Sequence, residues 1–349
     1  MTTSGRHGGD GSPSAPTRGR RLVIGSRGSA LALAQTRFMQ AELRRLAPEV
    51  ATEVRIIKTS ADKDQATSLR TPAETAGSSG AGVFVKELEQ ALLGGEIDLA
   101  VHSMKDVPTV LAPGLCIAAV PERESAFDAL VINKPALDAL VIDKPAPGAR
   151  TPLAILPPGA RVGTGSFRRQ AQLLALRPDI EILDIRGNVD TRIRKMEAGQ
   201  YDAVALACAG LRRLGLQRLV SYAFQPAEML PAPGQGALAV ETRADDDFAR
   251  SVASRLDHPP TAMAVAAERD FLERLGGGCN VPIAIYARVT RSGGGGVIEM
   301  DAVVASPDGR RVVRDALSGP PGRGAELVAA LAARILDAGG REILDEFRR

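Results

Sequence analysis

The feature that most constrains the fold is a repeated unit made of a short apolar strand, a turn with glycine or serine, and an amphipathic helix. Its first copy begins with a strand that ends near Ile24, continues through the turn GSRGS, and enters a segment with apolar residues at helical spacing. Ser29 is placed to act as the N-cap of that helix. A strand over 52–58 completes a strand, helix and strand, which is the unit of a parallel sheet.

The same unit recurs on both sides of a junction near residues 121–160, which predicts two α/β units. In the first unit a helix over about 84–93 leads into a strand over 97–101. The strands expected in the second unit cover 160–163, 180–185 and 202–206. Beyond residue 259 the pattern changes and predicts a small α+β unit. Its expected elements are a helix over 263–275, strands over 283–289, 297–305 and 311–317, and a helix over 324–338.

The junction contains a direct duplication, in which DALVINKPAL (128–137) is followed by DALVIDKPAP (138–147). One copy of DALVI is a good strand, whereas the second has no evident partner. We interpret the second copy as a tandem duplication that forms a surface loop, because lengthening a loop costs little closure entropy.

Composition narrows the class of protein. A chain of 349 residues is long enough for two or three domains. Residues 1–21 hold four arginines and Asp10, so this segment accounts for the whole formal charge of +3 and leaves a neutral body. With no Trp and 3% aromatic residues, the chain lacks both the charge and the stacking surfaces of a nucleic-acid-binding protein.

The N-terminal segment, the lack of a long apolar run and the few cysteines indicate where in the cell the protein is expected. The first 20 residues lack the apolar segment of a secretory signal, and we expect a disordered tail there; the alternative, a transit peptide, is weakened by Asp10. No apolar run reaches the ~18 residues of a membrane span. Three scattered cysteines without a CxxC pair predict neither a disulfide framework nor a metal site. A reducing, cytoplasmic location is therefore expected.

The segment AVHSMKDVPT (100–109) follows an expected strand, and such loops line the ligand crevice of an open α/β sheet. Pro108 prevents a helix from continuing there and holds Asp106 in a turn. Asp106 therefore either closes that turn or presents a carboxylate to the crevice. His102, in the same segment, is interpreted as a structural group.

Arginines gather at the ends of expected strands, and several of them stand at helix starts. Because the helix dipole favours anions at a helix N-terminus, these cations should meet something negative. Guanidinium groups suit carboxylates; phosphate is the alternative, but neither a GxxxxGK[ST] loop nor a GxGxxG after the first strand is present. The residues of this set are Arg27, Arg168, Arg169, Arg186 and Arg192, with Ser166 beside them.

Cys279 is the cysteine in an unusual setting, since it follows three glycines in RLGGGCNVPIA. Glycines let a bulky group approach closely, so the thiol is either a site of attachment or an incidental loop residue. Cys116 and Cys208 lie in apolar stretches and are expected in the core.

Several long segments, in order, resemble the porphobilinogen deaminase family, also called hydroxymethylbilane synthases. They are IGSRGSALALAQ, GVFVKELEQALLGGEIDLAVHSMKDVPT, GTGSFRRQAQLLALRPDIEILDIRGNVDTRIRKMEAGQYDAVALACAGLRRLGL, PAPGQGALAVE and GGGCNVPIA. The resemblance runs from about residue 22 to the carboxyl terminus and leaves out the tail and the duplicated junction.

The resemblance implies that Cys279 carries a dipyrromethane cofactor through a thioether bond. It also implies that four porphobilinogen molecules are added head to tail with loss of ammonia, and that water then releases hydroxymethylbilane for haem biosynthesis. By similarity, Asp106 is the catalytic carboxylate that stabilises the cationic azafulvene and helps to move protons. The residues expected to bind cofactor and substrate acids are Arg27, Ser29, Lys105, Ser166, Arg168, Arg169, Arg186 and Arg192.

The family fold is two α/β domains like the halves of a type II periplasmic binding protein, with the site between them, plus a small C-terminal α+β domain. The implied domains here are 21–121 with 237–255, then 127–230 and 259–349, after a tail over 1–20, and a monomer is expected.

The sequence departs from the family at three places, and these limit which residue roles the resemblance implies. A turn with Ala81 replaces the family's GGKG lysine, Ser125 and Phe127 stand in RESAFDAL, and Ala61 replaces a glycine. A solute-binding protein and a paralogue that has lost turnover remain the rival hypotheses.

Overall fold

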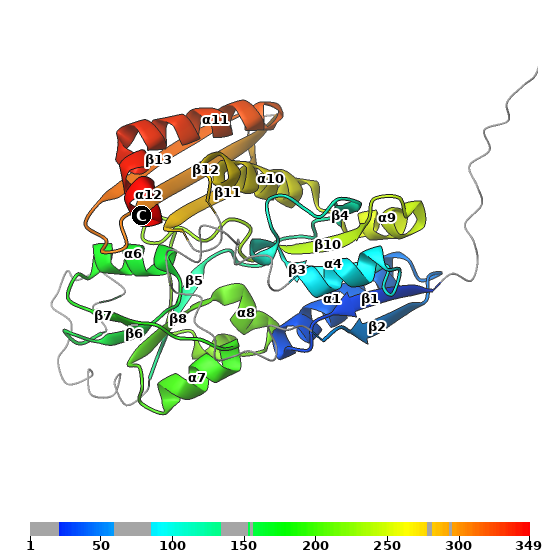
Figure 1. Ribbon diagram of the computed structural model, residues 1–349, viewed down its shortest axis with the longest axis horizontal. Helices are drawn as coiled ribbons and strands as arrows, with labels where there is room; N and C mark the ends of the chain where they lie inside the picture. The colour runs from blue at the N-terminus through cyan, green and yellow to red at the C-terminus, as the bar shows by residue number, and fades with distance from the viewer. Residues whose placement is uncertain (1–20, 59–84, 134–152, 154–155, 278–280, 293–294) are drawn as a thin grey trace, which may run out of the picture.

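The protein is described by a computed structural model over residues 21–58, 85–133, 153, 156–277, 281–292 and 295–349. Three sheets carry the described chain, and Figure 1 shows them as three separate bodies. The tail, the second DALVI copy, Ala61, Ala81 and Cys279 lie outside the described residues.

The first sheet has the strand order β2-β1-β3-β10-β4. Its strands are β1 (Leu22–Ser26), β2 (Thr52–Ile56), β3 (Leu99–Ser103), β4 (Leu115–Ala119) and β10 (Leu238–Arg243). β1 is parallel to β2 and β3, whereas β10 runs antiparallel to β3 and β4. Its helices are α1 (Ala30–Leu46), α4 (Lys86–Leu93) and α9 (Asp247–Ala253). The expected N-cap is confirmed, because the Ser29 side chain accepts from the backbone N–H of Ala32.

The second sheet repeats this arrangement in the order β7-β6-β8-β5-β9. Its strands are β5 (Asp128–Ile132), β6 (Arg161–Gly163), β7 (Glu181–Leu183), β8 (Ala203–Ala207) and β9 (Tyr222–Ala223), and its helices are α6 (Phe167–Leu176), α7 (Val189–Glu197) and α8 (Cys208–Arg213). β5, the first DALVI copy, is antiparallel to β8 and β9. Each of these two sheets contains one strand that runs antiparallel to the strands on both sides of it. In the first sheet this strand is β10, which comes after the whole second unit in the chain; in the second sheet it is β5, which comes before the other strands of that unit.

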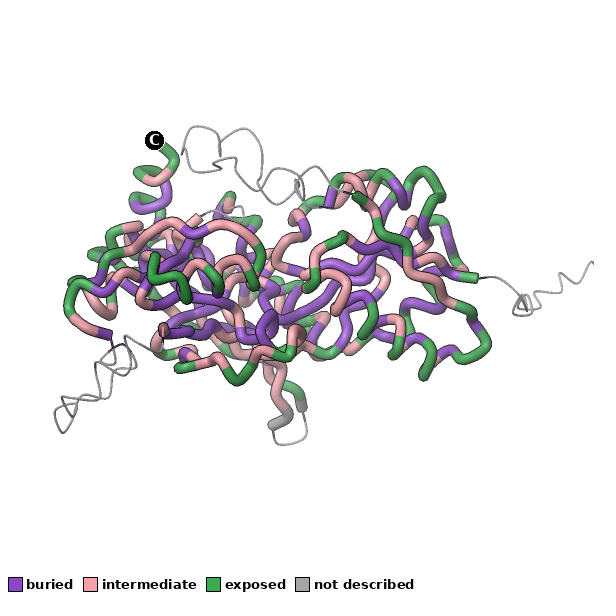
Figure 2. Tube along the Cα trace, turned by 90° about the horizontal axis from the view of Figure 1, so that it is seen from below, coloured by how far each residue is buried: buried purple, intermediate pink, exposed green. Residues whose placement is uncertain are grey.

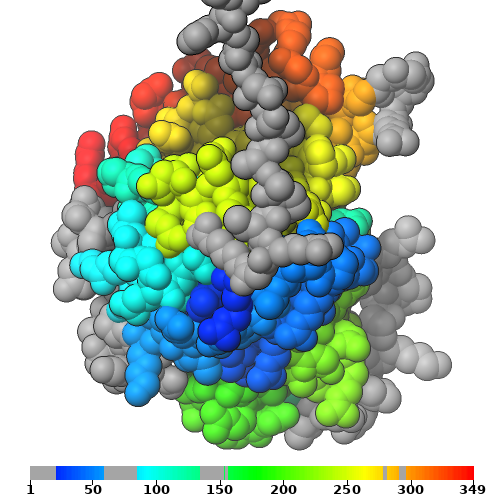
Figure 3. Space-filling model, turned by 90° about the vertical axis from the view of Figure 1, so that its right-hand side faces the viewer, coloured from blue at the N-terminus to red at the C-terminus, as the bar shows by residue number. Residues whose placement is uncertain are grey.

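This exchange of strands means that the chain crosses between the two sheets twice. Residues 120–127 lead into β5, and residues 224–237 lead back into β10. Figure 3 shows the result on the surface, where the yellow-green residues around α9 lie against the blue and cyan residues of the first unit. The expected fold class, two sheets of the type II binding-protein order plus a small α+β unit, is confirmed by the strand orders.

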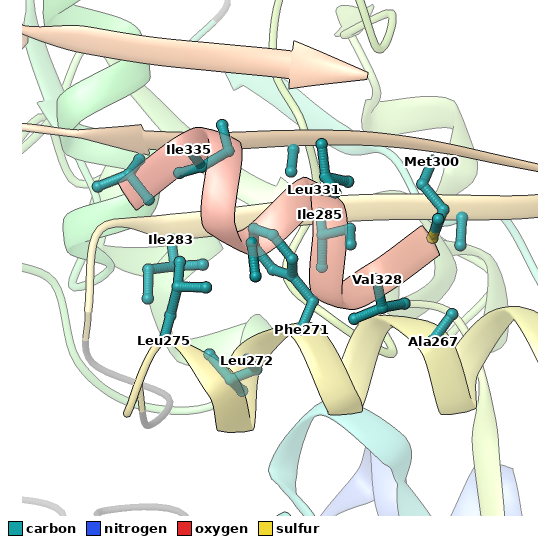
Figure 4. Close-up of a cluster of buried hydrophobic side chains, with 14 of the residues drawn as sticks. Ala267, Phe271, Leu272, Leu275, Ile283, Ile285, Met300, Val328, Leu331 and Ile335 are labelled. Atoms are coloured by element: carbon teal, nitrogen blue, oxygen red, sulfur yellow. The ribbon is translucent and has the colours of Figure 1, made fainter. Parts of the chain in front are cut away.

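The third sheet is an antiparallel meander of β11 (Ile283–Ser292), β12 (Gly295–Ala305) and β13 (Val312–Gly319). α10 (Pro259–Arg274) and α11 (Gly324–Ile335) cover one face of this sheet, and α12 (Arg341–Arg348) ends the chain. Figure 4 shows Phe271 of α10 pointing between Ile285 of the sheet and Leu331 of α11, and all three are completely buried. Burial of such side chains is the main stabilising contribution.

Single turns connect these elements: η2 (Met104–Asp106), η4 (Gln217–Leu219), η5 (Ser254–Leu256), η6 (Pro321–Arg323) and η7 (Leu336–Gly340). Buried residues follow the strands through the middle of the molecule, and the exposed residues lie at its margins (Figure 2). Among the helices that the structure describes, none combines the length and the apolar character needed to cross a membrane.

Candidate active site

A cavity of about 260 Å³ lies between the first two sheets. Its walls come from segments that follow strand ends, as expected for an open α/β fold: the start of α1, the turn after β3, the segment before α7, and α8. Six of the site residues expected from the sequence line it, namely Arg27, Ser29, Lys105, Asp106, Arg169 and Arg192. Residues more than 180 positions apart in the chain are thereby brought to one place only by the fold.

Asp106 is the last residue of the single turn η2 that follows β3. The turn is fixed by its neighbours, because the N–H of Val107 donates to the carbonyl of Met104 at 3.1 Å and the N–H of Met104 donates to Ala237 at 3.0 Å. The Asp106 side chain lines the cavity and makes no hydrogen bond within the described chain. Of the two alternatives, the backbone makes the turn, and the carboxylate faces the space where a ligand would bind.

Lys105 precedes it and is partly buried. Its Nζ donates to Oε1 of Gln235 at 3.3 Å. Burial and the nearby Arg169 guanidinium lower the pKa of Lys105 to about 8, against the opposing attraction of Asp106 and Asp128. A lysine in this range gains and loses its proton close to neutral pH.

Asp128, at the start of β5, is the anion that meets two of the arginines. Its Oδ2 accepts from Arg168 Nη1 at 2.6 Å, and its Oδ1 accepts from Arg169 Nε at 2.9 Å and from Gln235 Nε2 at 3.0 Å. Burial alone would raise the pKa of Asp128, but the two guanidinium groups hold it well below its usual range. For this pair, the negative partner expected from the sequence is a carboxylate of the chain itself.

Arg168 and Arg169 differ in whether they reach the cavity. Arg168 also donates to the carbonyl of Leu230 at 2.7 Å, is buried, and does not line the cavity. Arg169 donates to Ala205 at 3.0 Å but reaches the cavity wall. Ser166 is the N-cap of α6, accepting from the Arg169 N–H at 3.4 Å, and is also absent from the cavity wall. Ser166 therefore caps the helix that carries Arg169, and Arg168 shares the Asp128 carboxylate with Arg169; neither lines the cavity.

Arg192 and Arg186 flank the turn before α7. Arg192 lines the cavity and donates to the carbonyl of Gly187 at 2.8 Å. Burial and the charge of Arg169 lower the pKa of Arg192 to about 10. Arg186 pairs with Asp184 at 3.0 Å, keeps 28% of its side chain exposed, and does not line the cavity. The cavity therefore has a cationic inner wall, and Arg186 stands outside it.

Sequence reasoning did not single out Arg213, Gln35 or Gln235. Arg213 lines the cavity from α8 and donates to the carbonyl of Gly236 at 2.7 Å; burial lowers its pKa to about 10. Gln35 donates to Ser103 Oγ at 2.8 Å. A signal for Arg213 was available in the sequence, since CAGLRR directly follows the strand that ends at Ala207, as the other arginine-bearing segments follow theirs.

Other expectations about single residues have mixed outcomes. His102 is buried, as expected for a structural group, and its Nε2 lies 3.0 Å from Oε2 of Glu241. Cys208 is buried, whereas Cys116 is only partly buried, which corrects its expected place in the core. His258 stands at the N-cap position of α10, with Nδ1 2.8 Å from Thr261 Oγ1.

The described residues that precede Cys279 in the sequence are closely packed. A Cβ built on Gly277 would lie 2.7 Å from Leu272 Cδ1 and 2.8 Å from Ile283 Cδ1, so the chain passes tightly over the core here. Arg348 of α12 donates to the carbonyls of Leu275 at 2.6 Å and Gly276 at 3.0 Å. Leu275 and Gly276, which precede Cys279 in the sequence, are therefore held by the last helix of the chain.

Two family models match the chain: "Porphobilinogen deaminase, dipyromethane cofactor binding domain" over residues 22–251, and "Porphobilinogen deaminase, C-terminal domain" over residues 262–337. A porphobilinogen deaminase of Thermus thermophilus is 44% identical over 94% of this chain and all of its own length. One of Geobacter sulfurreducens is 45% identical over 93% of this chain and 94% of its own. A TRAP periplasmic solute binding protein of Desulfovibrio salexigens is 10% identical with a TM-score of 0.37, over 68% of this chain and 72% of its own, and supports no argument.

Proposed function

The chain belongs to the porphobilinogen deaminase family, and from this we propose that it is a transferase that joins four porphobilinogen molecules head to tail and then releases hydroxymethylbilane by hydrolysis. Each addition breaks the C–N bond of the incoming aminomethyl group and joins that methylene carbon to the free α-carbon of the terminal pyrrole. The α-carbon loses its proton, and the nitrogen leaves as ammonia. The family's dipyrromethane cofactor is the primer on which this chain grows, and Cys279 is the proposed point of attachment through a thioether.

The observation that carries the proposal is the pairing of one carboxylate with several cations in a single cavity. Every pyrrole ring of the substrate bears an acetate and a propionate, so the ligand is an acidic chain. Arg27, Arg169 and Arg192 line the cavity and suit carboxylates, because a guanidinium presents parallel N–H donors. Each charge-assisted hydrogen bond contributes about 1.5–3 kcal/mol, enough for a few of them to hold a flexible chain in register.

The residues that line the cavity also fit a dipyrromethane. A group with four carboxylates requires cationic donors and a polar lining, and the cavity supplies both together with Ser29 and Lys105. In the proposed roles Asp106 accepts pyrrole N–H bonds and stabilises positive charge on the reacting pyrrole. Lys105, Arg27, Ser29, Arg169 and Arg192 hold the acid groups. Ser166 caps the helix that carries Arg169, Arg168 shares the Asp128 carboxylate with Arg169, and Arg186 serves longer chains at the margin.

We further propose the domain division 21–121 with 237–255, 127–230 and 259–349, supported by the distribution of the strands over three sheets. A cytoplasmic monomer is the proposed state, in keeping with the biosynthetic role of the family.

The decisive experiment measures the intact mass of the purified protein and its colour with Ehrlich's reagent. The parent should carry the mass of a dipyrromethane and gain successive increments when porphobilinogen is supplied. Cys279→Ser should carry neither the adduct nor the increments. A parent protein with a bare thiol that stays unmodified with porphobilinogen would support a binding protein or an inactive paralogue instead.

A further inference from the structure

Arg269 of α10 holds the backbone that directly follows the proposed catalytic carboxylate. Its Nη1 donates to the carbonyl of Val107 at 3.0 Å, and its Nη2 donates to the carbonyls of Pro108 and Thr109 at 2.5 and 3.1 Å. Three consecutive carbonyls therefore converge on one guanidinium from the third unit. None of the proposed site roles includes this residue.

These carbonyls need such a donor because the local sequence provides none. Residues 107–109 lie between η2 and β4, and within the described chain their carbonyls accept no backbone hydrogen bond. Pro108 has no N–H and interrupts any regular ladder. A guanidinium carries five donors in a fixed plane, so it can satisfy several carbonyls and fix their relative orientation at once.

Apolar packing acts on the same turn from the same helix face. Ala262, Val265 and Arg269 share one face of α10, and Val265 packs against Met104 and Val107, which bracket Lys105 and Asp106. The opposite face of α10, with Ala264, Ala267 and Phe271, belongs to the core of the third unit. Figure 4 shows this core face of the helix, with the first unit in cyan on its other side.

The neighbouring residue fixes α10 to the crossings between the sheets. Glu268 is fully buried, accepts from Arg123 at 2.7 Å, and also accepts from the N–H groups of Gly234 and Ala287. α10 therefore cannot shift freely along the turn that it contacts. The helix ends at Arg274, and Cys279 follows five residues later in the sequence.

We propose that Arg269 is a positioning residue for the reaction. By holding the carbonyls of residues 107–109, it fixes the direction in which Asp106 presents its carboxylate to the cavity. The helix that leads to the cofactor-bearing cysteine thereby also sets the catalytic turn, which keeps the two in register while the bound chain lengthens. The inference rests on the proposed catalytic role of Asp106.

The test is a double-mutant cycle on the full-length holoenzyme, with Arg269→Met, Asp106→Asn and their combination. Arg269→Met should lower kcat by about 10- to 100-fold, because small misplacements of a reacting group have effects of this size. The KM for porphobilinogen should change less than about threefold, and the adduct mass should be unchanged. In the Asp106→Asn background, Arg269→Met should lower kcat by no more than about twofold, because it acts through that carboxylate.

Two further variants separate positioning from general damage. Arg269→Lys, which keeps the charge but loses the fork, should have an intermediate kcat; it also replaces Arg269→Met in the cycle if that variant does not fold. Arg314→Met removes a matched contact of the third unit, the bonds from Arg314 to the carbonyls of Pro226 and Ala227 at 2.6 and 3.0 Å. This control should keep the parental kcat.

Each outcome decides a separate point. A parental kcat in Arg269→Met with a slow Asp106→Asn overturns the positioning role alone. Effects that multiply in the double variant overturn it as well, because Arg269 would then act independently of Asp106. A parental kcat in Asp106→Asn overturns the proposed role of the carboxylate, and the inference about Arg269 with it.

Discussion

Asp106 and Lys105 are neighbours in sequence, yet the fold gives them different surroundings. The carboxylate faces the cavity without a hydrogen bond inside the described chain, whereas the ammonium donates to Gln235. In the proposed roles, Asp106 stabilises positive charge on the reacting pyrrole, and Lys105 binds the carboxylates of the substrate. Their separate substitution should therefore have different consequences.

Asp106→Asn should fold, keep its stability, and carry the dipyrromethane, since the side chain makes no hydrogen bond within the described chain. Its steady-state consumption of porphobilinogen should fall by about 100-fold or more, the range for loss of a positioned acid–base group. Steady-state rates on mass-verified holoenzyme measure this effect. A rate equal to that of the parent would remove Asp106 from the chemistry.

Lys105 should make stability depend on pH. Because its folded pKa lies near 8, below the ordinary 10.5, the unfolded chain binds more protons between these values, and the free energy of unfolding should rise with pH across this window. Lys105→Met removes this term, so its stability advantage over the parent should shrink from pH 8 to pH 10. Urea unfolding of both proteins at several pH values measures this difference in stability. A difference that does not change with pH would contradict the lowered pKa of Lys105.

At the scale of elements, the buried cluster around Asp128 joins β5, the start of α6 and the crossing over 224–237. One carboxylate satisfies two guanidinium groups and the amide of Gln235, which in turn accepts from Lys105. The cluster thus connects the framework of the second sheet to the turn of the first sheet that carries Asp106. Its contribution is to hold Arg169 at the cavity wall.

Asp128→Asn should reduce the free energy of unfolding by about 3–5 kcal/mol, because it leaves two buried guanidinium groups without their counter-charge. The matched control is Asp202→Asn, which breaks the partly exposed pair with Arg161 at 2.9 Å and should cost no more than about 1 kcal/mol. Denaturant titrations of both variants provide the comparison. Equal losses would show that burial of the Asp128 pair adds nothing.

Element boundaries show how far local patterns reach. The strand expected over 97–101 is observed as Leu99–Ser103, because the pairing with β1 and β10, rather than the apolar run, sets its limits. β4, β9, β10 and α12 were not predicted from the sequence. β10 pairs antiparallel between β3 and β4, and nothing in its local sequence indicates partners so distant in the chain.

At the scale of the whole molecule, the third unit contacts both of the others. α10 grips the first unit through Arg269, while the ring of Phe347 lies edge-on to Phe167 of α6 at 5.0 Å and Arg314 reaches the loop at Pro226. The two crossings between the sheets are themselves in close contact. A movement of the first two units that widens the cavity would therefore change the contacts of the third unit with them and the contact between the two crossings.

Gly236 marks the tightest of them, with φ at +89° and a hypothetical Cβ only 2.3 Å from the carbonyl oxygen of Glu124 and 2.6 Å from that of Ser125. Gly236→Ala should lower the melting temperature by several degrees or prevent folding, because backbone atoms cannot move aside. Gly199→Ala, with φ at +78° and nothing within 4 Å, bears only the backbone cost. Thermal unfolding of both variants tests this, and a Gly236→Ala melting temperature equal to that of the control would place the crossings further apart.

The sequence by itself determined the class of the fold, most of its strands and helices, and the family, because apolar periodicity, caps and long motifs are local properties of the chain. It also identified the residue types of the site, including Asp106 and three of the arginines that line the cavity, Arg27, Arg169 and Arg192. Only the tertiary structure decided which arginine does what: Asp128 holds Arg168 and Arg169, Arg186 stands outside the wall, and Arg213 joins it. Asp128 lies 40 and 41 positions before the two arginines that it pairs with, and such pairing depends on burial and distance, which exist only after the chain has folded.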